Sequence, residues 1–426
     1  MMSNWRFLLG RFQRQLWARS ALYCVAGIGT AVIAAVAGPY VHLGKAEWLG
    51  TNAVSHLLTI MAASMLTVAT FSLSTMVTAF TAASSSTTPR AMQLLIEDNL
   101  AQRALSTFIG SFLFSIVGLI ALSAGVYNAS GRVLLFAATL VMIGAVVGTL
   151  LAWIDSLPSF GRVATTIDRV EAAAKTAIVS RAKQPHLGGM AAMEIPADAQ
   201  VVRANSVGFV RHVDVGELQE LAEAGELRVY VAALPGTFVD HNQPLAYVEG
   251  AADERTQKRI VKAFVVGGSR TYEEDPRFGL IVLTEIAIRA LSPAINDPGT
   301  AIDVIGTVVR LLSLGVDTRL KAEQKNSEDD DNHGRTRHLR VYVPEIEPHE
   351  YVDDVFNPIA RDGASFFEVV IKLQRALSTL QKLGDERLAA AAKRHAQQAM
   401  SRAEQAMTLA SDFETLRQKV DALESA

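Results

Sequence analysis

Cysteine is nearly absent from this sequence, since Cys24 is the only one in 426 residues. Cys24 lies inside an apolar segment, which excludes an intramolecular disulfide and a cysteine-based zinc site and suits a reducing compartment. Concentrated positive charge is also missing, because the formal net charge is −3 and the pI is near 6.3. A nucleic-acid-binding domain normally presents a basic surface, so we expect no nucleic-acid partner.

Catalytic signatures are missing as well. The sequence contains no GxxxxGK phosphate loop, no GxSxG nucleophile elbow and no HExxH zinc motif. His212 and His241 lie in a segment rich in strand-forming residues, where a hydrogen-bonded surface histidine is the default interpretation. The sequence therefore predicts no enzyme activity, no catalytic residue, no bound metal and no cofactor.

Charged residues make up 19% of the chain but almost disappear between residues 20 and 154. Four apolar windows in this region are long enough, at about 1.5 Å per residue, to cross about 30 Å of hydrocarbon as helices. None of them contains Asp, Glu, Lys or Arg: Ala21–Gly38, His56–Phe80, Ala104–Ala124 and Val133–Ile154. The predicted fold class is a helical membrane protein, with four transmembrane helices followed by an α+β region.

The basic residues that flank these windows predict the orientation of the chain. Residues 1–19 carry arginines and no acidic residue, which is typical of a cytoplasmic amphipathic lead-in. A cleaved signal peptide is the alternative, but three further spans follow. The outward loops hold Lys45 and Arg132. The inward segments hold more positive charge, from Arg6, Arg11, Arg14, Arg19, Arg90, Arg103, Arg162, Arg169 and Lys175. We therefore expect a multi-pass protein of the bacterial inner membrane with both termini in the cytoplasm.

Hydroxyl side chains recur every three or four residues along the second window, so they form one polar stripe on a helix. The stripe consists of Ser64, Thr67, Thr70, Ser74, Thr78, Thr81, Ser85 and Thr88. Two interpretations are open. The hydroxyls can bond the carbonyl four residues back or a neighbouring helix, which requires no water. Alternatively, they line a hydrated path for a small ion or solute.

Four sequence blocks resemble a known family. They are STMVTAFTAASSSTTPRAMQLLIED from Ser74, LSTFIGSFLFSIVGL from Leu105, GGSRTYEEDPRFG from Gly267 and ALSPAINDPGTAID from Ala290. These blocks are similar to an uncharacterised bacterial family of predicted membrane proteins that contain a domain of unknown function (number 2254). Members usually have Ser-Pro-Arg where this chain has Thr88, Pro89 and Arg90. The resemblance implies a membrane protein, but it implies no activity, substrate or catalytic residue.

Composition divides the chain into further segments. They are the lead-in 1–19, the membrane domain 20–154, a helical linker 155–187, a small β-module 188–250, a helical region 251–320, a mobile acidic loop 321–338, and a strand plus C-terminal helices at 339–426. The run PGTFVDHNQPLAYVE from Pro235 is similar to barrel-sandwich carriers of biotin or lipoate. No lysine for attachment occurs between Lys183 and Lys258, so a structural module is expected. The C-terminal helices are expected to form a hairpin or a coiled coil between subunits.

Two loops of the cytoplasmic part are candidate ligand or gating segments. Arg270 with Glu273 or Asp275 can bind an anion or form local ion pairs. Asp297 is suited to cap a helix that begins at Pro298, and the alternative is an anion site formed with Asn296. The candidate residues are Arg90, Arg270, Asp275, Asn296 and Asp297.

The leading functional hypothesis from the sequence is a homo-oligomeric channel or passive transporter. In this hypothesis the second helix lines the path and the cytoplasmic part forms a vestibule or gate. The alternative is a membrane-anchored regulatory or scaffolding protein that transports nothing and whose four spans only pack together.

Overall fold

The computed structural model describes residues 21, 25, 28–29, 32–33, 51–86, 88–96, 99–127, 129–157, 162–328 and 338–424. The predicted lead-in and nearly all of the first predicted span therefore lie outside the described residues. The described residues form two compact units. We call residues 51–85 and 92–165 the N-terminal unit, and residues 86–91 and 166–424 the C-terminal unit.

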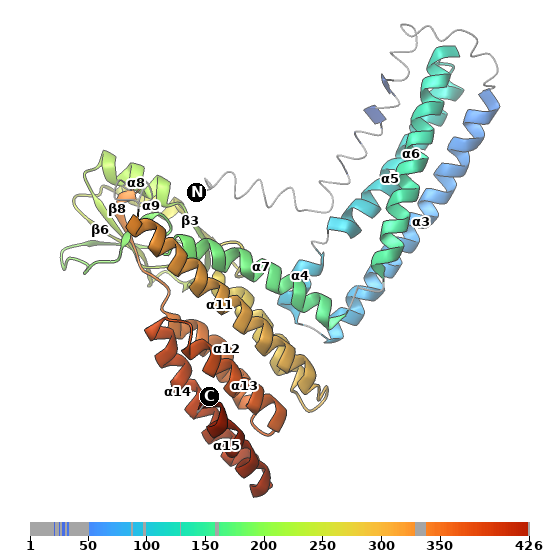
Figure 1. Ribbon diagram of the computed structural model, residues 1–426. Coiled ribbons are helices and arrows are strands. Elements are labelled where there is room, and N and C mark those ends of the chain that lie inside the picture. The colour runs from blue at the N-terminus through green and yellow to red at the C-terminus, as the bar shows by residue number, and fades with distance from the viewer. Residues whose placement is uncertain are drawn as a thin grey trace. The chain divides into compact units, whose positions relative to one another are not determined.

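Three long helices make up the N-terminal unit: α3 (Thr51–Ser86), α5 (Asn99–Ser123) and α6 (Ala129–Ser156). They lie side by side in Figure 1. Two apolar clusters hold them together, one around Leu58, Phe114 and Leu135 and the other around Met65 and Phe108. All five of these side chains are buried.

The three helices contain stretches long and apolar enough to cross a membrane, at Asn52–Thr81, Ala101–Ser123 and Ser130–Ser156. These stretches match the second, third and fourth predicted spans. A fourth helical stretch, Pro298–Gln324, meets the same length and composition criteria. It belongs to α11 (Pro298–Glu328), which carries Asp303, Arg310 and Arg319 and buries Val304, Ile305 and Val308 within the C-terminal unit. An amphipathic helix that packs in a protein core accounts for this composition.

The helix that bears the hydroxyl stripe ends before Pro89. α3 stops at Ser86, and α4 (Pro89–Ile96) begins with the proline at its first position, where no backbone donor is needed. The Thr88 hydroxyl accepts a hydrogen bond from the Ala91 amide at 3.3 Å, as a helix cap does. The prediction that Thr88 continues the stripe is therefore wrong, because Thr88 caps the next helix.

The C-terminal unit contains a β-module with two sheets. The larger sheet has the strand order β1-β8-β4-β6-β2, and the smaller has the order β5-β3-β7. The strands are β1 (Gly189–Ala191), β2 (Gln200–Arg203), β3 (Gly208–Val213), β4 (Arg228–Val231), β5 (Phe238–Val239), β6 (Pro244–Glu249), β7 (Phe264–Gly267) and β8 (His338–Val343). Both sheets and the helices α8 (Val215–Ala224) and α9 (Glu254–Lys262) share one hydrophobic core.

The β-module extends beyond the predicted range 188–250. β7 pairs with β3, and β8 lies between β1 and β4, parallel to both. The alternation of Leu339, Val341 and Val343 correctly predicted a strand, but alternation does not reveal which sheet a strand joins. Because β8 follows α11, the helical region is an insertion into the module.

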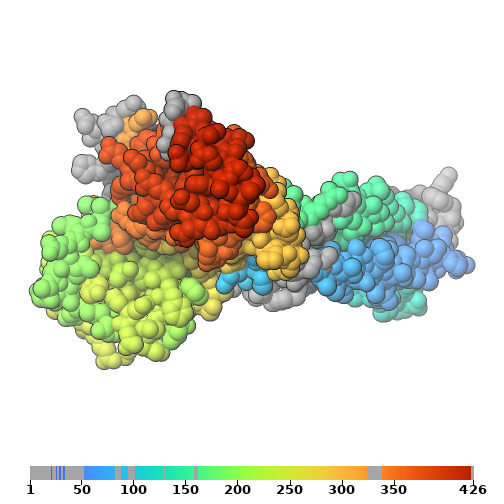
Figure 2. Space-filling model, turned by 90° about the horizontal axis from the view of Figure 1, so that it is seen from below, coloured from blue at the N-terminus to red at the C-terminus, as the bar shows by residue number. Residues whose placement is uncertain are grey.

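Helices form the rest of the C-terminal unit. They are α7 (Val163–Lys183), α10 (Pro276–Ala290), α11, α12 (Pro348–Asp362), α13 (Phe367–Gln381), α14 (Glu386–Ala406) and α15 (Ala410–Glu424). Figure 2 shows the C-terminal helices, in red, gathered beside the green and yellow β-module. The predicted helical linker at 155–187 is interrupted, because α6 ends at Ser156 and α7 begins at Val163.

The acidic loop and the C-terminal helices also differ from what the sequence predicted. Residues 321–328, predicted to be part of a mobile loop, form the last turns of α11, because Lys321, Ala322 and Glu323 are good helix formers. Residues 329–337, which hold Asp329, Asp330 and Asp331, lie outside the described residues. The apolar stripe of the C-terminal helices is buried within this chain, where Val370 packs with Leu416 and Val420.

Candidate functional site

The hydroxyl stripe lies on the outer face of α3. Thr67, Ser74 and Thr81 are exposed. Leu58 and Met65, which pack against the other helices, lie on the opposite side of α3, since a helix turns by about 100° per residue. The stripe thus runs along the face that makes no packing contact within the described part of the N-terminal unit.

Most stripe hydroxyls bond their own helix. The Thr70 hydroxyl donates to the carbonyl of Leu66 at 2.9 Å, and the Thr78 hydroxyl donates to that of Ser74 at 3.0 Å. Ser64, Thr67 and Thr81 make the same bond to the carbonyl four residues back. Each hydroxyl oxygen keeps lone pairs that can accept from another group. The side chain of Ser85 lies outside the described residues.

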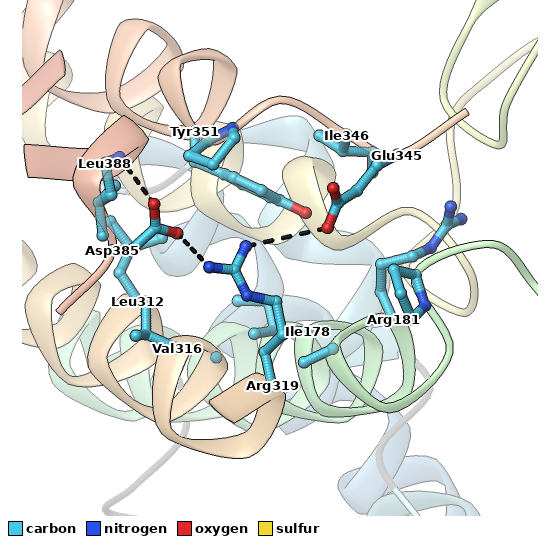
Figure 3. Close-up of a pocket in the computed structure, with 14 residues that line it drawn as sticks. Ile178, Arg181, Leu312, Val316, Arg319, Glu345, Ile346, Tyr351, Asp385 and Leu388 are labelled. Carbon is cyan, nitrogen blue, oxygen red and sulfur yellow. Dashed lines mark hydrogen bonds and ion pairs between the residues drawn. The ribbon is translucent and has the colours of Figure 1, made fainter. Parts of the chain in front are cut away.

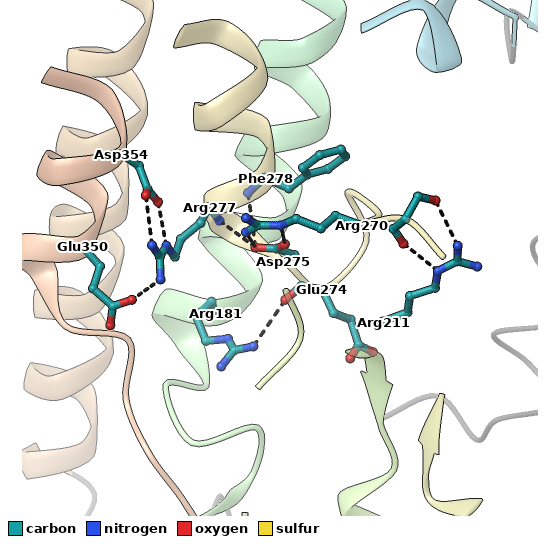
Figure 4. Close-up of polar contacts among 10 residues, drawn as sticks. Arg181, Arg211, Arg270, Glu274, Asp275, Arg277, Phe278, Glu350 and Asp354 are labelled. Carbon is teal, nitrogen blue, oxygen red and sulfur yellow. Dashed lines mark hydrogen bonds and ion pairs between the residues drawn. The ribbon is translucent and has the colours of Figure 1, made fainter. Parts of the chain in front are cut away.

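The GGSRTYEEDPRFG motif forms an ion-pair network in the C-terminal unit (Figure 4). The Arg270 guanidinium donates to both carboxylate oxygens of Asp275, at 2.6 and 2.9 Å. Asp275 is only 3% exposed, and it also caps α10 by accepting from the amides of Arg277 and Phe278. Of the two alternatives for Arg270, the local ion pair is the one present.

A glycine makes room for this buried carboxylate. Gly236 has φ +97°, a conformation that side chains rarely adopt. A Cβ atom added to Gly236 would lie 2.4 Å from Oδ2 of Asp275. The β-module turn therefore packs directly against the Asp275 carboxylate.

Neighbouring residues extend the network to α12 and the β-module. The Arg277 guanidinium donates to both oxygens of Asp354, at 2.6 and 2.9 Å, and pairs with Glu350. Burial lowers the pKa of Arg277, but the bonds and charges of these acids raise it overall. The Glu274 carboxylate contacts Nδ1 of the buried His212 at 2.6 Å. The motif thus joins α10, α12 and β3.

Arg90 contacts the middle of α10. Its guanidinium pairs with Glu285, and its carbonyl accepts from the Tyr272 hydroxyl at 3.1 Å. The four-residue spacing of Glu285 and Arg289 on α10 would favour a pair between them, but the partner of Glu285 is Arg90, 195 residues earlier in the chain. Sequence spacing on one helix gave no indication of this longer-range partner.

The loop before α11 has the predicted cap. Oδ1 of Asp297 accepts from the Thr300 amide at 3.1 Å, and Oδ2 accepts from the Thr300 hydroxyl at 2.6 Å. These hydrogen bonds from Thr300 lower the pKa of Asp297. Asn296 has φ +53° and is exposed. The cap and the backbone hydrogen bonds from the amides of Asn296 and Asp297, to the carbonyls of Ser292 and Ala290, hold the loop in this conformation.

The candidate ligand or gating residues do not converge on one point. Arg270 and Asp275 lie at the start of α10, whereas Asn296 and Asp297 follow its end, and a helix of 15 residues spans about 22 Å. Sequence reasoning missed Arg277, although it lies inside the recognised motif. It also missed Arg181, a buried residue of α7, because its sequence neighbours are like those of any exposed arginine on a charged helix. Among the described residues, no cluster of His, Cys, Asp or Glu could hold a metal ion.

A unit of long apolar helices and a second, ion-paired α+β unit define the class of a membrane protein with a substantial polar part. The chain belongs to the family described as "Predicted membrane protein (DUF2254)", whose sequence model matches residues 13–379. The resemblance inferred from the four sequence blocks is therefore confirmed.

Two mycobacterial relatives resemble part of the chain. Uncharacterized proteins of Mycobacterium bovis and Mycobacterium tuberculosis are each 36% identical to it over 116 residues. The matched region is 26% of this chain and 22% of each relative, so the chain spans about a fifth of the length of these relatives. No solved structure matches the chain.

Proposed function

We propose that this chain is a non-enzymatic protein of the bacterial inner membrane that assembles with copies of itself and forms a passive path for a small ion or solute. The α3 helices of several subunits surround this path. The observation that supports the proposal best is the position of the hydroxyl stripe, exposed on the side of α3 opposite its packed face. Uncharged hydroxyls offer hydrogen bonds to a passing solute without a fixed charge that would trap it.

The flanks of the stripe are suited to a contact between subunits. Leu66 and Leu73 lie along one side of the stripe, and each is more than 45% exposed. Such side chains can seal the seams between neighbouring α3 helices. A Cβ added at Gly148 of α6 meets nothing within 4 Å, so another helix could approach closely there.

Both termini and the C-terminal unit are placed in the cytoplasm in this proposal. Its support is the excess of arginine in the segments assigned to the inner side. The C-terminal unit would then form the vestibule or gate. Its ion pairs between distant segments, such as Arg90 with Glu285, would hold the vestibule in one arrangement.

The second candidate is a membrane-anchored regulatory or scaffolding protein. The hydrogen bonds from the stripe hydroxyls to the carbonyls four residues back favour it, because they satisfy the hydroxyls without water. The two candidates differ in whether the stripe is hydrated.

Cysteine accessibility tests hydration directly, since replacing Cys24 by serine leaves a chain without cysteine. In that background, Thr67→Cys and Ser74→Cys are compared with the matched flank variants Leu66→Cys and Leu73→Cys in liposomes. A membrane-impermeant thiol reagent is expected to modify the stripe positions and spare the flank positions. Ion flux from the same liposomes should fall when Thr67 and Thr78 are both replaced by leucine. Unreactive stripe cysteines together with no flux from the native chain would refute the path.

A further inference from the structure

A pocket lies within the C-terminal unit, between α7, α11, α12 and the start of α14 (Figure 3). It is a partly open pocket whose lining residues come from four separate helices and the segments between them. Most of its lining is aliphatic, from residues such as Ile178, Leu312, Val316 and Leu388. Four charged side chains also line it: Arg181, Arg319, Glu345 and Asp385.

Arg181 is a buried cation without a counter-ion. It is 6% exposed, and its one hydrogen bond runs from Nη2 to the carbonyl of Glu274 at a long 3.3 Å. Its Nη1 atom has no hydrogen-bond partner and it makes no ion pair within the part of the chain that the structure describes. Burial lowers the pKa of Arg181, although Tyr351, Glu274 and Asp275 nearby act in the opposite direction. A buried charge is normally paired, so this arrangement is costly.

Arg319 lies in the same pocket, but unlike Arg181 it has acidic side chains close to its guanidinium. It pairs with the buried Asp385, and its distances to Glu345 and Glu323 are 3.8 and 3.5 Å. In Figure 3, Asp385 lies at the far end of the pocket from Arg181, with Arg319 and Tyr351 between them. Asp385 at one end of the pocket thus has Arg319 as its ion-pair partner, whereas Arg181 at the other end has no such partner among the described residues.

We propose that this pocket binds a short-chain aliphatic monocarboxylate, with its carboxylate against Arg181 and its hydrocarbon chain along Ile178, Leu312 and Val316. The carboxylate supplies the missing counter-ion and accepts from the unpartnered N–H groups, in the geometry that guanidinium groups favour. A single negative charge fits because Glu345 and Asp385 would repel a second one. The aliphatic lining accounts for the chain.

Calorimetric titration of the full-length chain in detergent tests this site, with hexanoate as the probe. Hexanoate is expected to bind saturably, whereas hexanol and inorganic phosphate are expected to bind at least about tenfold more weakly, because each lacks one of the two features recognised. Arg181→Met should weaken hexanoate binding at least about tenfold. Arg228→Met, which removes an exposed arginine of the β-module, should leave it unchanged.

A second pair of variants separates ligand binding from a structural role. Without ligand, Arg181→Met should keep or raise the melting temperature, because it removes an unpaired buried charge. Arg319→Met should lower it, because it leaves Asp385 buried and unpaired. Val316→Phe fills the aliphatic part of the pocket and should also abolish hexanoate binding. Absence of saturable binding to the native chain, equal binding to Arg181→Met, or binding of phosphate as tight as that of hexanoate would each overturn the proposal.

Discussion

The two units of this protein satisfy their polar groups over different distances along the chain. In α3, threonine hydroxyls bond carbonyls only four residues away. In the C-terminal unit, Arg277 bonds Asp354 77 residues later, and Arg310 bonds Glu171 139 residues earlier. A hydroxyl on a helix can bond the carbonyl four residues back, so these threonines need no distant partner. In a unit with a polar surface, charged pairs between distant segments can fix the tertiary arrangement.

The largest effect is expected where a buried ion pair and a helix cap share one side chain. Asp275→Ala removes the cap of α10 and leaves Arg270, only 18% exposed, without its partner. The free energy of unfolding should fall by about 3–5 kcal/mol. Denaturant titration of the full chain, with hydrogen exchange of α10, would measure the change.

The matched change in the N-terminal unit is Thr70→Val, which removes one local hydroxyl bond. It should cost about 0.6 kcal/mol, as polar contacts in membrane helices do on average. If the two substitutions cost the same, a buried ion pair of the C-terminal unit would be worth no more than a single hydroxyl bond of α3.

Two glycines, one in each unit, allow a second comparison between the units. Gly236→Ala forces φ +97° on a residue with a side chain. It also places the new Cβ against the Asp275 carboxylate, which is paired with Arg270. The expected cost is about 2–4 kcal/mol of unfolding free energy, from backbone strain and overpacking. Gly144→Ala in α6 is the control, since its Cβ meets nothing within 4 Å. A melting temperature of Gly236→Ala that equals the native value would show that the turn rearranges freely.

The sequence predicted what depends on neighbours along the chain. The three described spans followed from uncharged runs, and the Asp297 cap followed from the residue types around Pro298. The presence of strands between residues 188 and 250 followed from a segment rich in strand-forming residues. In each case the physical cause lies within a few residues, so the pattern can be read directly.

What the sequence did not predict depends on folding. The position of β8 between β1 and β4, the pairing of Arg90 with Glu285 and the lack of a counter-ion for Arg181 all arise from segments far apart in the chain. An arginine on a charged helix has the same local pattern whether it becomes exposed or buried. Only the packing of α7 in the folded unit distinguishes Arg181 from its neighbours.

A smaller effect is expected at the cap of α11, whose hydrogen bonds are local although it lies in the C-terminal unit. Asp297→Ala removes the bonds from the Thr300 amide and hydroxyl and should cost about 1 kcal/mol. Asp297→Asn retains an acceptor for the amide and should cost less. Chemical denaturation of both variants measures the difference. Equal losses would mean that the negative charge, rather than the hydrogen bond, stabilises the helix start.

The smallest effect is expected from the titration of His395, which contacts Asp353 42 residues earlier in the chain. Several groups shift the pKa of His395 in opposite directions. Burial lowers the pKa of His395, while its 2.6 Å contact with Asp353 acts in the opposite direction and Arg394 and Arg402 lower it further. Because the folded pKa is below the ordinary value of 6.5, the unfolded chain binds a proton first as the pH falls. Stability should therefore be intact above pH 6.5 and should decline as the pH falls from there to the lowered folded pKa.

His395→Gln keeps a hydrogen-bond donor for Asp353 but cannot titrate, so its stability should change less over this pH range. Denaturation midpoints of both chains at several pH values below neutral test the difference. Burial raises the pKa of Asp353, but the bond and charge of His395 and the contact with Arg394 together lower it overall, so its protonation affects stability only in a more acidic range. A native chain that becomes more stable between pH 7 and pH 6 would reverse the sign and show that the Asp353 contact, rather than burial, controls this histidine.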